Sequence, residues 1–453
     1  MRTGKILFSV LAVAAAALVL CACKETKENS GKAPDNEVVY VTATPTSKVY
    51  SLPEYTSTPT PEVTPDTYED LKELFRPSTT LDKKLGKFYR QVFDDSYITM
   101  GNTYRLKQKL EKARAGEEIT VLFIGGSVTE GANATEKTPK NLRKGYAYIT
   151  YEYLRDTYGV GDGSNVKYVN VGISGTGSNL GMVRVQKDIL DHKPDIVFVE
   201  FAVNNSTDVY DRETYESLLR RVLKSETEPA VFLLFSAATY AGAAQNYMLG
   251  DGQLYDLPMI SMQDGLKTVQ ALKIITWSDF SGDNVHPAQD GHYLYARCIC
   301  RVIDKIFEEG TDESYTVPEE TTVTGFDCFE NAVELENNDE KGLIVQTGCF
   351  EPKHTTFYAT NMSDTCAFEN GWVKSKSTSG KDAPMTVKVK CRNFSIVVKQ
   401  INASAEASVD VYVDGVKKKT IVTSKPGAWN NAETFLIFTR EEAEEHVFEI
   451  RTN

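Results

Sequence analysis

Short apolar runs alternate with longer amphipathic segments through the middle of the chain. The apolar runs have the length and composition of buried strands, and they lie at 119–124, 166–171, 195–203, 230–236 and 257–261. Around them, apolar residues recur at helical spacing in the segments 104–115, 146–158, 181–190, 215–224 and 292–307. Strands that alternate with helices predict an α/β fold with a doubly wound parallel sheet over about residues 68–312.

The pattern changes after about residue 312. Strand-like runs dominate from 313 to 453, and in the run VDVYVDGVKK the side chains of Val409, Val411 and Val413 fall on one face. Asp414-Gly415 follows directly and is a strong signal for a two-residue hairpin turn. Residues 313–453 are therefore expected to form an all-β domain, a sandwich or jelly roll, that is a candidate carbohydrate-binding domain.

The first 23 residues have the pattern of an export signal. Arg2 and Lys5 precede an apolar stretch at 6–20, which is short for a membrane span. The small residue Ala22 before Cys23 resembles the cleavage site of a bacterial lipoprotein. That resemblance implies cleavage of the Ala22–Cys23 bond, a lipid on Cys23, and a chain anchored at the extracellular face of a bacterial cell membrane. A plain secretory signal is the alternative.

The segment between the signal and the α/β domain has a different composition. Residues 24–67 are rich in Thr, Ser and Pro, have no helical period, and predict a disordered tether. The formal net charge of the whole chain is −13, which argues against nucleic acid as a partner.

The cysteines leave their own chemistry open. Of 8 cysteines, two lie in the signal and four lie in the predicted β domain: Cys328, Cys349, Cys366 and Cys391. An exported context permits disulfides in any of three pairings, and buried thiols fit equally well. No CxxC motif or histidine cluster points to a metal, so the sequence predicts no metal and no cofactor.

The stretch VLFIGGSVTEG, at 121–131, places a serine just past the end of a predicted strand. Gly125 and Gly126 break the strand, and Ser127 follows them. Open α/β sheets bind ligands at the carboxyl ends of their strands, and glycines allow close approach to the backbone. Ser127 is therefore a candidate nucleophile, and a turn serine that caps a helix is the alternative.

Three later segments carry matching polar residues. NVGISGTGS follows a predicted strand and offers the backbone N–H of Gly175, and VEFAVNN ends another strand and offers the amide of Asn204. SGDNVHP supplies Asp283 and His286. Ester cleavage needs an activated hydroxyl, a base and donors for the developing oxyanion, and these segments contain all of them. Each residue alone could equally serve a turn or a cap.

Ser127, Gly175, Asn204 and the pair Asp283/His286 occur in the order of the four blocks of the SGNH hydrolases, the GDSL-type esterases and acylhydrolases, and the chain resembles that family over roughly residues 119–305. The resemblance implies a flavodoxin-like sheet and a catalytic triad of Ser127, His286 and Asp283. The oxyanion donors would be the N–H groups of Ser127 and Gly175 and the side-chain amide of Asn204.

The chain departs from the family pattern at three positions. Gly126 stands where the first block usually has Asp, Ala202 where the third block has Gly, and Asn205 where it has Asp. These changes put the fit of the substrate in doubt more than the chemistry, because Ser127 and Asn204 are both present.

These features predict a serine esterase that releases a short acyl group, expected to be acetyl, from a cell-wall or plant polysaccharide. An exported chain and an appended β domain favour an acylated carbohydrate as the partner. The alternatives are a lipase or lysophospholipase, an O-acyltransferase with the same triad, and a non-catalytic glycan-binding surface lipoprotein.

Overall fold

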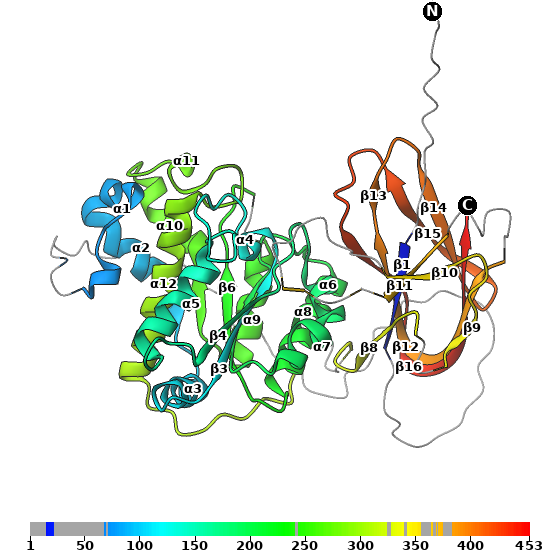
Figure 1. The fold of residues 1–453 in the computed structure, drawn as a ribbon, viewed down its shortest axis with the longest axis horizontal. Coiled ribbons are helices and arrows are strands. Elements are labelled where there is room, and N and C mark those ends of the chain that lie inside the picture. Colours follow the sequence, from blue (N-terminus) through cyan, green and yellow to red (C-terminus); the bar gives the residue numbers. More distant parts are fainter. Residues whose placement is uncertain are drawn as a thin grey trace, which may run out of the picture. The chain divides into compact units, whose positions relative to one another are not determined.

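The computed structural model describes residues 15–21, 68, 71–240, 243–323, 328–338, 342–354, 364–365, 368, 370–374 and 383–453. They fall into two compact units, and Figure 1 labels the elements of both. The α/β unit lies within 44–330 and 360–367, and the β unit lies within 1–43, 331–359 and 368–453. Cys23, Cys366 and the predicted tether at 24–67 lie outside the described residues.

The α/β unit is built on a six-stranded sheet in the order β2-β7-β6-β5-β3-β4. The strands are β2 (Tyr97–Thr99), β3 (Ile119–Gly125), β4 (Val166–Asn170), β5 (Ile196–Glu200), β6 (Ala230–Phe235) and β7 (Met259–Ser261). All neighbouring pairs are parallel except β2 and β7. The chain enters the parallel part at β3, places β4 on one side of it and continues from β5 on the other, so the strand order reverses between β3 and β5. This confirms the predicted doubly wound sheet.

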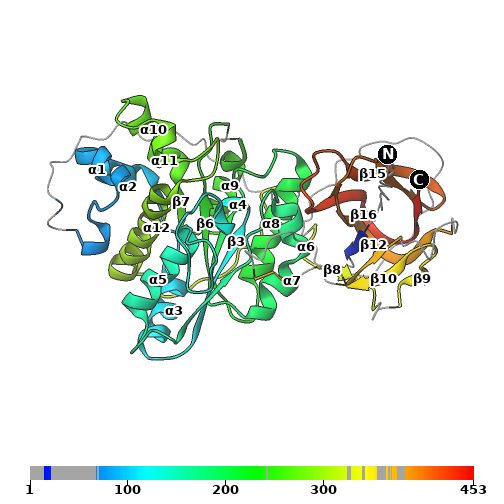
Figure 2. The same ribbon diagram turned by 45° about the horizontal axis from the view of Figure 1, so that its top comes forward.

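Helices cover both faces of this sheet. One face carries α2 (Tyr89–Ser96), α3 (Tyr104–Arg114), α5 (Tyr146–Tyr158), α10 (Met262–Ala271) and α12 (Gln289–Glu309), and the other carries α6 (Ser178–Val183), α8 (Val209–Leu223) and α9 (Ala243–Leu254). Figure 2 shows α3, α5 and α12 on one side of the strands and α6 and α8 on the other. In β3, Val121 and Phe123 join the first layer, and Leu122 and Ile124 are also buried. Coverage on both faces explains why these strands are almost wholly apolar.

The shorter helical elements of the α/β unit lie at its edges and in its loops. They are η1 (Glu73–Phe75), α1 (Thr80–Leu85), η2 (Gly86–Phe88), α4 (Ser127–Glu130), α7 (Val185–Asp188), η3 (Leu190–His192) and α11 (Trp277–Phe280).

Two predicted elements differ from the structure. The helix predicted at 181–190 is divided between α6 and α7 at Arg184, whose buried guanidinium donates to the carbonyl of Val171 at 2.6 Å. The strand predicted at 195–203 ends at Glu200, because the carbonyl of Phe201 accepts from the N–H groups of residues 204 and 205 and turns the chain. Both differences reflect tertiary contacts that the local pattern does not contain.

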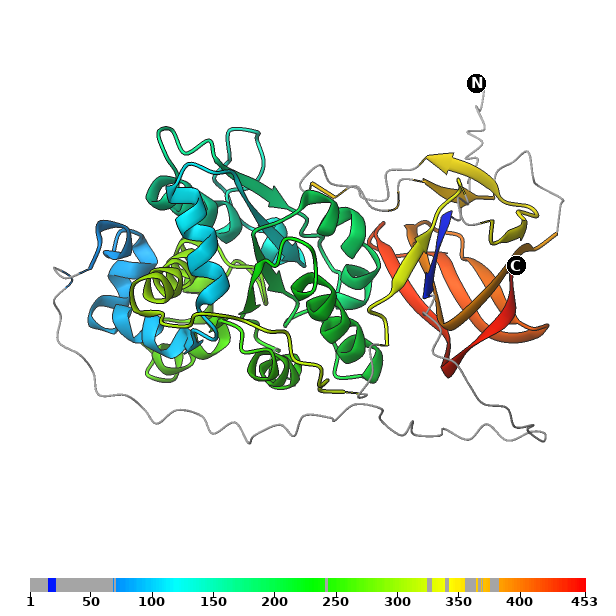
Figure 3. The same ribbon diagram turned by 90° about the horizontal axis from the view of Figure 1, so that it is seen from below.

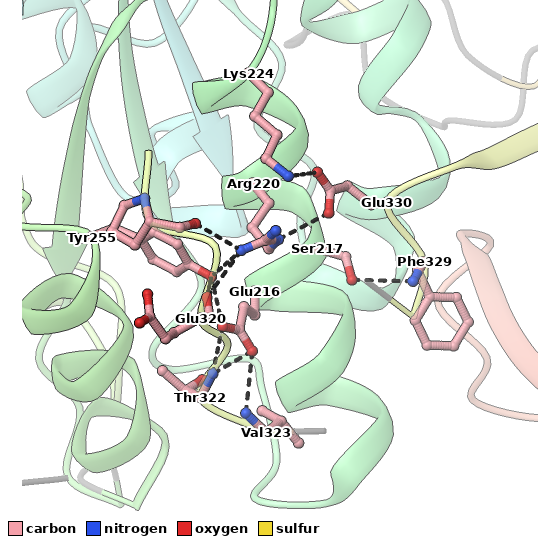
Figure 4. A network of polar contacts seen from close by, with 11 residues as sticks. Glu216, Ser217, Arg220, Lys224, Tyr255, Glu320, Thr322, Val323, Phe329 and Glu330 are labelled. Carbon is pink, nitrogen blue, oxygen red and sulfur yellow. Dashed lines mark hydrogen bonds and ion pairs between the residues drawn. The ribbon is translucent and has the colours of Figure 1, made fainter. Parts of the chain in front are cut away.

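The segment that follows α12 stays with the α/β unit beyond residue 312. Figure 4 shows how α8 holds it. The Glu216 carboxylate accepts from the N–H of Thr322 at 2.6 Å, and Arg220 donates to the carbonyl of Glu320 at 3.0 Å. Glu330 pairs with Arg220 at 2.9 Å. These contacts place the segment up to residue 330 in the α/β unit.

The β unit consists of β8 (Ala332–Leu335), β9 (Ile344–Gln346), β10 (Glu351–His354), β11 (Asn370–Val373), β12 (Met385–Lys399), β13 (Ile401–Asn402), β14 (Ala407–Val413), β15 (Val416–Lys425) and β16 (Ala432–Thr452). Its pairs are antiparallel except β13 and β15. Asp414 and Gly415 have φ of +50° and +79° and form the predicted hairpin turn between β14 and β15. The all-β prediction is confirmed.

The β unit also includes a strand from the N-terminal segment. β1 (Ala15–Cys21) lies between β11 and β12, antiparallel to both, and Figure 3 shows it in blue. This strand falls inside the predicted signal, so the predicted cleavage would remove it from the mature chain. Among the described residues, no helix has the length and apolar character needed to cross a membrane.

Candidate active site

The four sequence blocks meet the sheet where its strand order reverses. Ser127 is the first residue of α4 and follows directly after β3, and Asn204 lies in the turn after β5. β3 and β5 are parallel neighbours, with Gly125 opposite Glu200 at their carboxyl ends. A crevice at such a reversal is where doubly wound sheets bind their ligands.

The two glycines before Ser127 leave room for a side chain of the same block and for one of the third block. A Cβ on Gly126 would lie 2.1 Å from Oδ1 of Asn204, and a Cβ on Gly125 would lie 2.2 Å from Oγ1 of Thr129. Both distances are too short for any side chain. The turn of the first block is therefore in direct contact with the asparagine of the third block.

Ser127, His286 and Asp283 form a continuous chain of hydrogen bonds. Oγ of Ser127 lies 2.7 Å from Nε2 of His286, and Nδ1 of His286 lies 2.7 Å from Oδ2 of Asp283. Because an ionised carboxylate only accepts hydrogen bonds, the proton sits on Nδ1, which leaves Nε2 to accept from the serine hydroxyl. The imidazole is thus held in the tautomer that a general base requires.

Asp283 is held as a carboxylate by its own loop. Its partial burial acts to raise the pKa, but the N–H groups of His286 and Val285, at 2.8 and 2.9 Å, and the His286 ring outweigh that effect and lower the pKa to about 2. Asn133 adds a hydrogen bond to Oδ2 at 3.2 Å. The Ser281 hydroxyl donates to the His286 carbonyl at 2.6 Å and closes the loop.

The groups predicted as oxyanion donors have no other use in the described part of the chain. The N–H groups of Ser127 and Gly175 and the side-chain nitrogen of Asn204 make no hydrogen bond with a described residue. Gly175 has φ of +72°, a conformation that favours glycine. The N–H of its neighbour Ser174 donates to Glu130 of α4 at 3.0 Å, so the second block is fixed to the helix that begins with Ser127.

Asn205 joins the second and third blocks. Its Oδ1 accepts from the N–H of Ser178 at 2.8 Å, and its Nδ2 donates to the Ser178 hydroxyl at 2.7 Å and to Tyr247 at 2.9 Å. The amide therefore bonds a donor and acceptors together, which the aspartate usual at this position could not do in its ionised form.

A second histidine bonds to the backbone of residues that follow the first block. His292 is fully buried, its Nε2 donates to the carbonyl of Ala132 at 2.9 Å, and its Nδ1 accepts from the N–H of Tyr146 at 3.2 Å. Burial lowers its pKa to about 4. It is therefore neutral near pH 7, with both ring nitrogens bonded to backbone groups.

The sequence analysis missed two residues near the site. Asn133 has φ of +64° and reaches the carboxylate of Asp283, and nothing in the local sequence signals this contact. Glu200 is a fully buried carboxyl at the end of β5. A signal for it exists, because it is the one charged residue inside the apolar run IVFVEFAV.

The described residues contain no group of three or more His, Cys, Asp or Glu side chains placed to hold a metal ion. Cys298, Cys300 and Cys349 are buried and free.

Comparisons with known proteins place this geometry in a class. Residues 123–294 match the model of the GDSL-like lipase/acylhydrolase family, and Ser127, Gly175, Asn204, Asp283 and His286 all lie inside that range. An acetylxylan esterase of Geobacillus stearothermophilus is 26% identical over an alignment of 216 residues that covers 42% of this chain and 96% of that protein.

Solved structures extend the similarity to both units. A two-domain esterase active on acetylated mannans, co-crystallised with mannopentaose, matches with a TM-score of 0.67 and 29% identity over 80% of this chain and 92% of that one. A second crystal structure of such an esterase matches with the same TM-score and identity and covers 93% of that chain.

The chain is therefore a carboxylic ester hydrolase. The resemblance noted from the four blocks is supported by the GDSL-like family match, which lies within the α/β unit.

Proposed function

We propose that the chain is an extracellular acetyl esterase that removes acetyl groups from a polysaccharide by a Ser-His-Asp mechanism. The observation that carries this proposal is the hydrogen-bonded series from Ser127 through His286 to Asp283, with both distances at 2.7 Å. The activities of the related esterases, on acetylated xylan and on acetylated mannans, support an acetyl group on a polysaccharide as the substrate.

In this mechanism Oγ of Ser127 attacks the ester carbonyl carbon and passes its proton to Nε2 of His286. Asp283 stabilises the imidazolium that results. The oxyanion accepts hydrogen bonds from the N–H groups of Ser127 and Gly175 and from the amide of Asn204. The sugar hydroxyl leaves with the proton from His286, and water then releases acetate from the acyl-serine by the same steps.

Acetylated mannan is the first candidate substrate. The esterase active on mannans matches both units of this chain and covers 80% of it, whereas the acetylxylan esterase covers 42%. Acetylated xylan is the second candidate on the strength of that shorter match. The β unit would then hold the polymer near the esterase unit, as a carbohydrate-binding domain.

The substitution Ser127→Ala tests the proposal, with Ser164→Ala, an exposed serine of the same unit, as the control. Ser127→Ala should abolish the release of acetate from p-nitrophenyl acetate and from acetylated mannan, with an unchanged melting temperature. Wild-type turnover by Ser127→Ala would overturn the mechanism. Acetylated xylan, acetylated peptidoglycan and a lysophospholipid assayed in parallel separate the polysaccharide esterase from the lipase. Transfer of acetyl to an added glycan without free acetate would identify the acyltransferase instead.

The location at the cell surface is a proposal that depends on Cys23. Expression of the full chain in a bacterium with labelled palmitate should label the wild type and not Cys23→Ala. A labelled Cys23→Ala chain would contradict lipidation at this residue, and an unlabelled, secreted wild type would favour the plain secretory signal.

A further inference from the structure

Behind Ser127, on the side of the turn that faces the protein interior, lies a buried carboxyl that the mechanism above does not use. Glu200 is the last residue of β5, lies opposite Gly125 in the sheet and has no solvent exposure. Transfer of a carboxyl out of water is costly unless hydrogen-bond donors compensate it. The contacts that Glu200 makes inside the protein therefore indicate its role.

One donor to Glu200 comes from the turn that carries the nucleophile. The hydroxyl of Thr129 donates to Oε2 of Glu200 at 3.0 Å and accepts from Tyr146 at 2.8 Å. Oε1 of Glu200 is buried and has no hydrogen-bond partner among the described residues. Thr129 follows Ser127 by two residues in α4, so the carboxyl contacts the short helix that begins with the nucleophile.

The electrostatic surroundings of Glu200 keep its ionisation within the range of ordinary assays. Burial raises its pKa to about 7, although the hydrogen bond from Thr129 acts in the opposite direction. Four tyrosines on different segments are close enough to be affected by its charge. Burial raises their pKa values, and the charge of Glu200 adds to that effect: Tyr146 of α5, Tyr215 of α8, Tyr240 after β6 and Tyr295 of α12.

We propose that Glu200 is a positioning residue, whose carboxyl holds Thr129 in the short helix α4 and so aims the hydroxyl of Ser127, the first residue of that helix, at His286. Protonation removes an acceptor site from the carboxyl, and the turn then loses part of its support. This inference rests on the proposed function, because it assigns Glu200 a role only through Ser127.

The test is Glu200→Gln, which keeps the size of the side chain and removes its ionisation. The matched control is Glu216→Gln, because Glu216 is also buried with a raised pKa but bonds the connecting segment at Thr322. Turnover of p-nitrophenyl acetate is measured from pH 5 to 9, together with the rate at which a phosphonate titrant labels Ser127.

We expect Glu200→Gln to lower kcat by about 100-fold, the usual effect of a misplaced reacting group, with KM little changed and full final labelling of Ser127. In the wild type kcat/KM should fall with two protonations as the pH decreases, and in Glu200→Gln with one. Glu216→Gln should keep the wild-type kcat and pH profile. A Glu200→Gln enzyme with wild-type kcat and profile would overturn the proposal.

A second pair of variants decides the matter if Glu200→Gln does not fold. Thr129→Val removes the hydroxyl that donates to Glu200, and Thr129→Ser restores it. The serine variant should recover most of the kcat that the valine variant loses, and equal kcat in the two would contradict the proposal. Active Ser127→Ala would defeat the proposed function itself, whereas inactive Ser127→Ala beside a fully active Glu200→Gln would defeat this inference alone.

Discussion

Two carboxyl groups lie on opposite sides of Ser127, and their surroundings shift their pKa values in opposite directions. On the outer side, Asp283 lies on a loop with its side chain 46% exposed, and the N–H groups of that loop help lower its pKa to about 2. On the inner side, Glu200 ends a buried strand, and burial raises its pKa to about 7. The comparison shows that a few hydrogen bonds suffice to lower the pKa of a carboxyl that water reaches, whereas burial moves the pKa of an interior carboxyl toward neutrality.

The outer carboxylate should have the larger effect on the reaction. Asp283→Asn should lower kcat by about 10⁴-fold, because the amide favours the tautomer of His286 that cannot accept the proton of Ser127. Steady-state kinetics on p-nitrophenyl acetate measure this effect, and the melting temperature serves as the control for folding. A loss of kcat smaller than that of Glu200→Gln would contradict the larger role assigned to Asp283.

Substitution of Asn204 should have an intermediate effect on kcat. Asn204→Ala removes the one side-chain donor offered to the oxyanion and should lower kcat by about 10²–10³-fold, the usual result of losing one such donor. Asn205→Ala is the informative neighbour, because Asn205 bonds Ser178 and Tyr247. Asn205→Ala should lower the melting temperature and change kcat little. An equal loss of kcat in Asn204→Ala and Asn205→Ala would contradict the separate roles of the two residues.

The smallest expected effect is on the free energy of unfolding, and it should depend on pH in opposite directions for Glu200 and Asp283. Glu200 has a raised pKa in the folded state, so the stability it contributes below pH 4.5 is lost as the pH rises through about 7. Asp283 has a lowered pKa, so its contribution is present above pH 3.8 and is lost as the pH falls through about 2.

Urea unfolding at pH 5 and pH 8 tests this contrast. Relative to the wild type, Glu200→Gln should gain stability between the two pH values, by no more than about 3 kcal/mol. Asp283→Asn should show no such gain. A Glu200→Gln variant whose relative stability does not rise with pH would mean that the pKa of Glu200 is not raised in the folded enzyme, so that its carboxyl is already ionised at pH 5.

The sequence predicted most of the sheet and the residues that form the hydrogen-bonded series. Buried parallel strands are continuous apolar runs, so β3, β5 and β6 are visible locally, and Ser127 and His286 stand next to glycine or proline turns at strand and helix ends. α9 and α10 were not predicted.

What the sequence could not supply depends on contacts between distant segments. The break at Arg184 requires the carbonyl of Val171, and the contact of Asn133 with Asp283 joins residues 150 positions apart. Glu200 was visible as a charge in an apolar run, but its partners on α4 were not. Periodicity describes the face of an element, and it carries no information about which distant group will meet that face.

The hold of α8 on the segment before residue 330 has a practical consequence for anyone who wishes to exchange the modules of this enzyme. A junction cut near residue 312 would remove the hydrogen bonds that Glu216 makes with Thr322 and Arg220 makes with Glu320, and would leave Tyr255 as the partner that they share. A chimera that retains the chain through Glu330 keeps these hydrogen bonds and the ion pair between Arg220 and Glu330. A foreign domain is therefore better joined after residue 330.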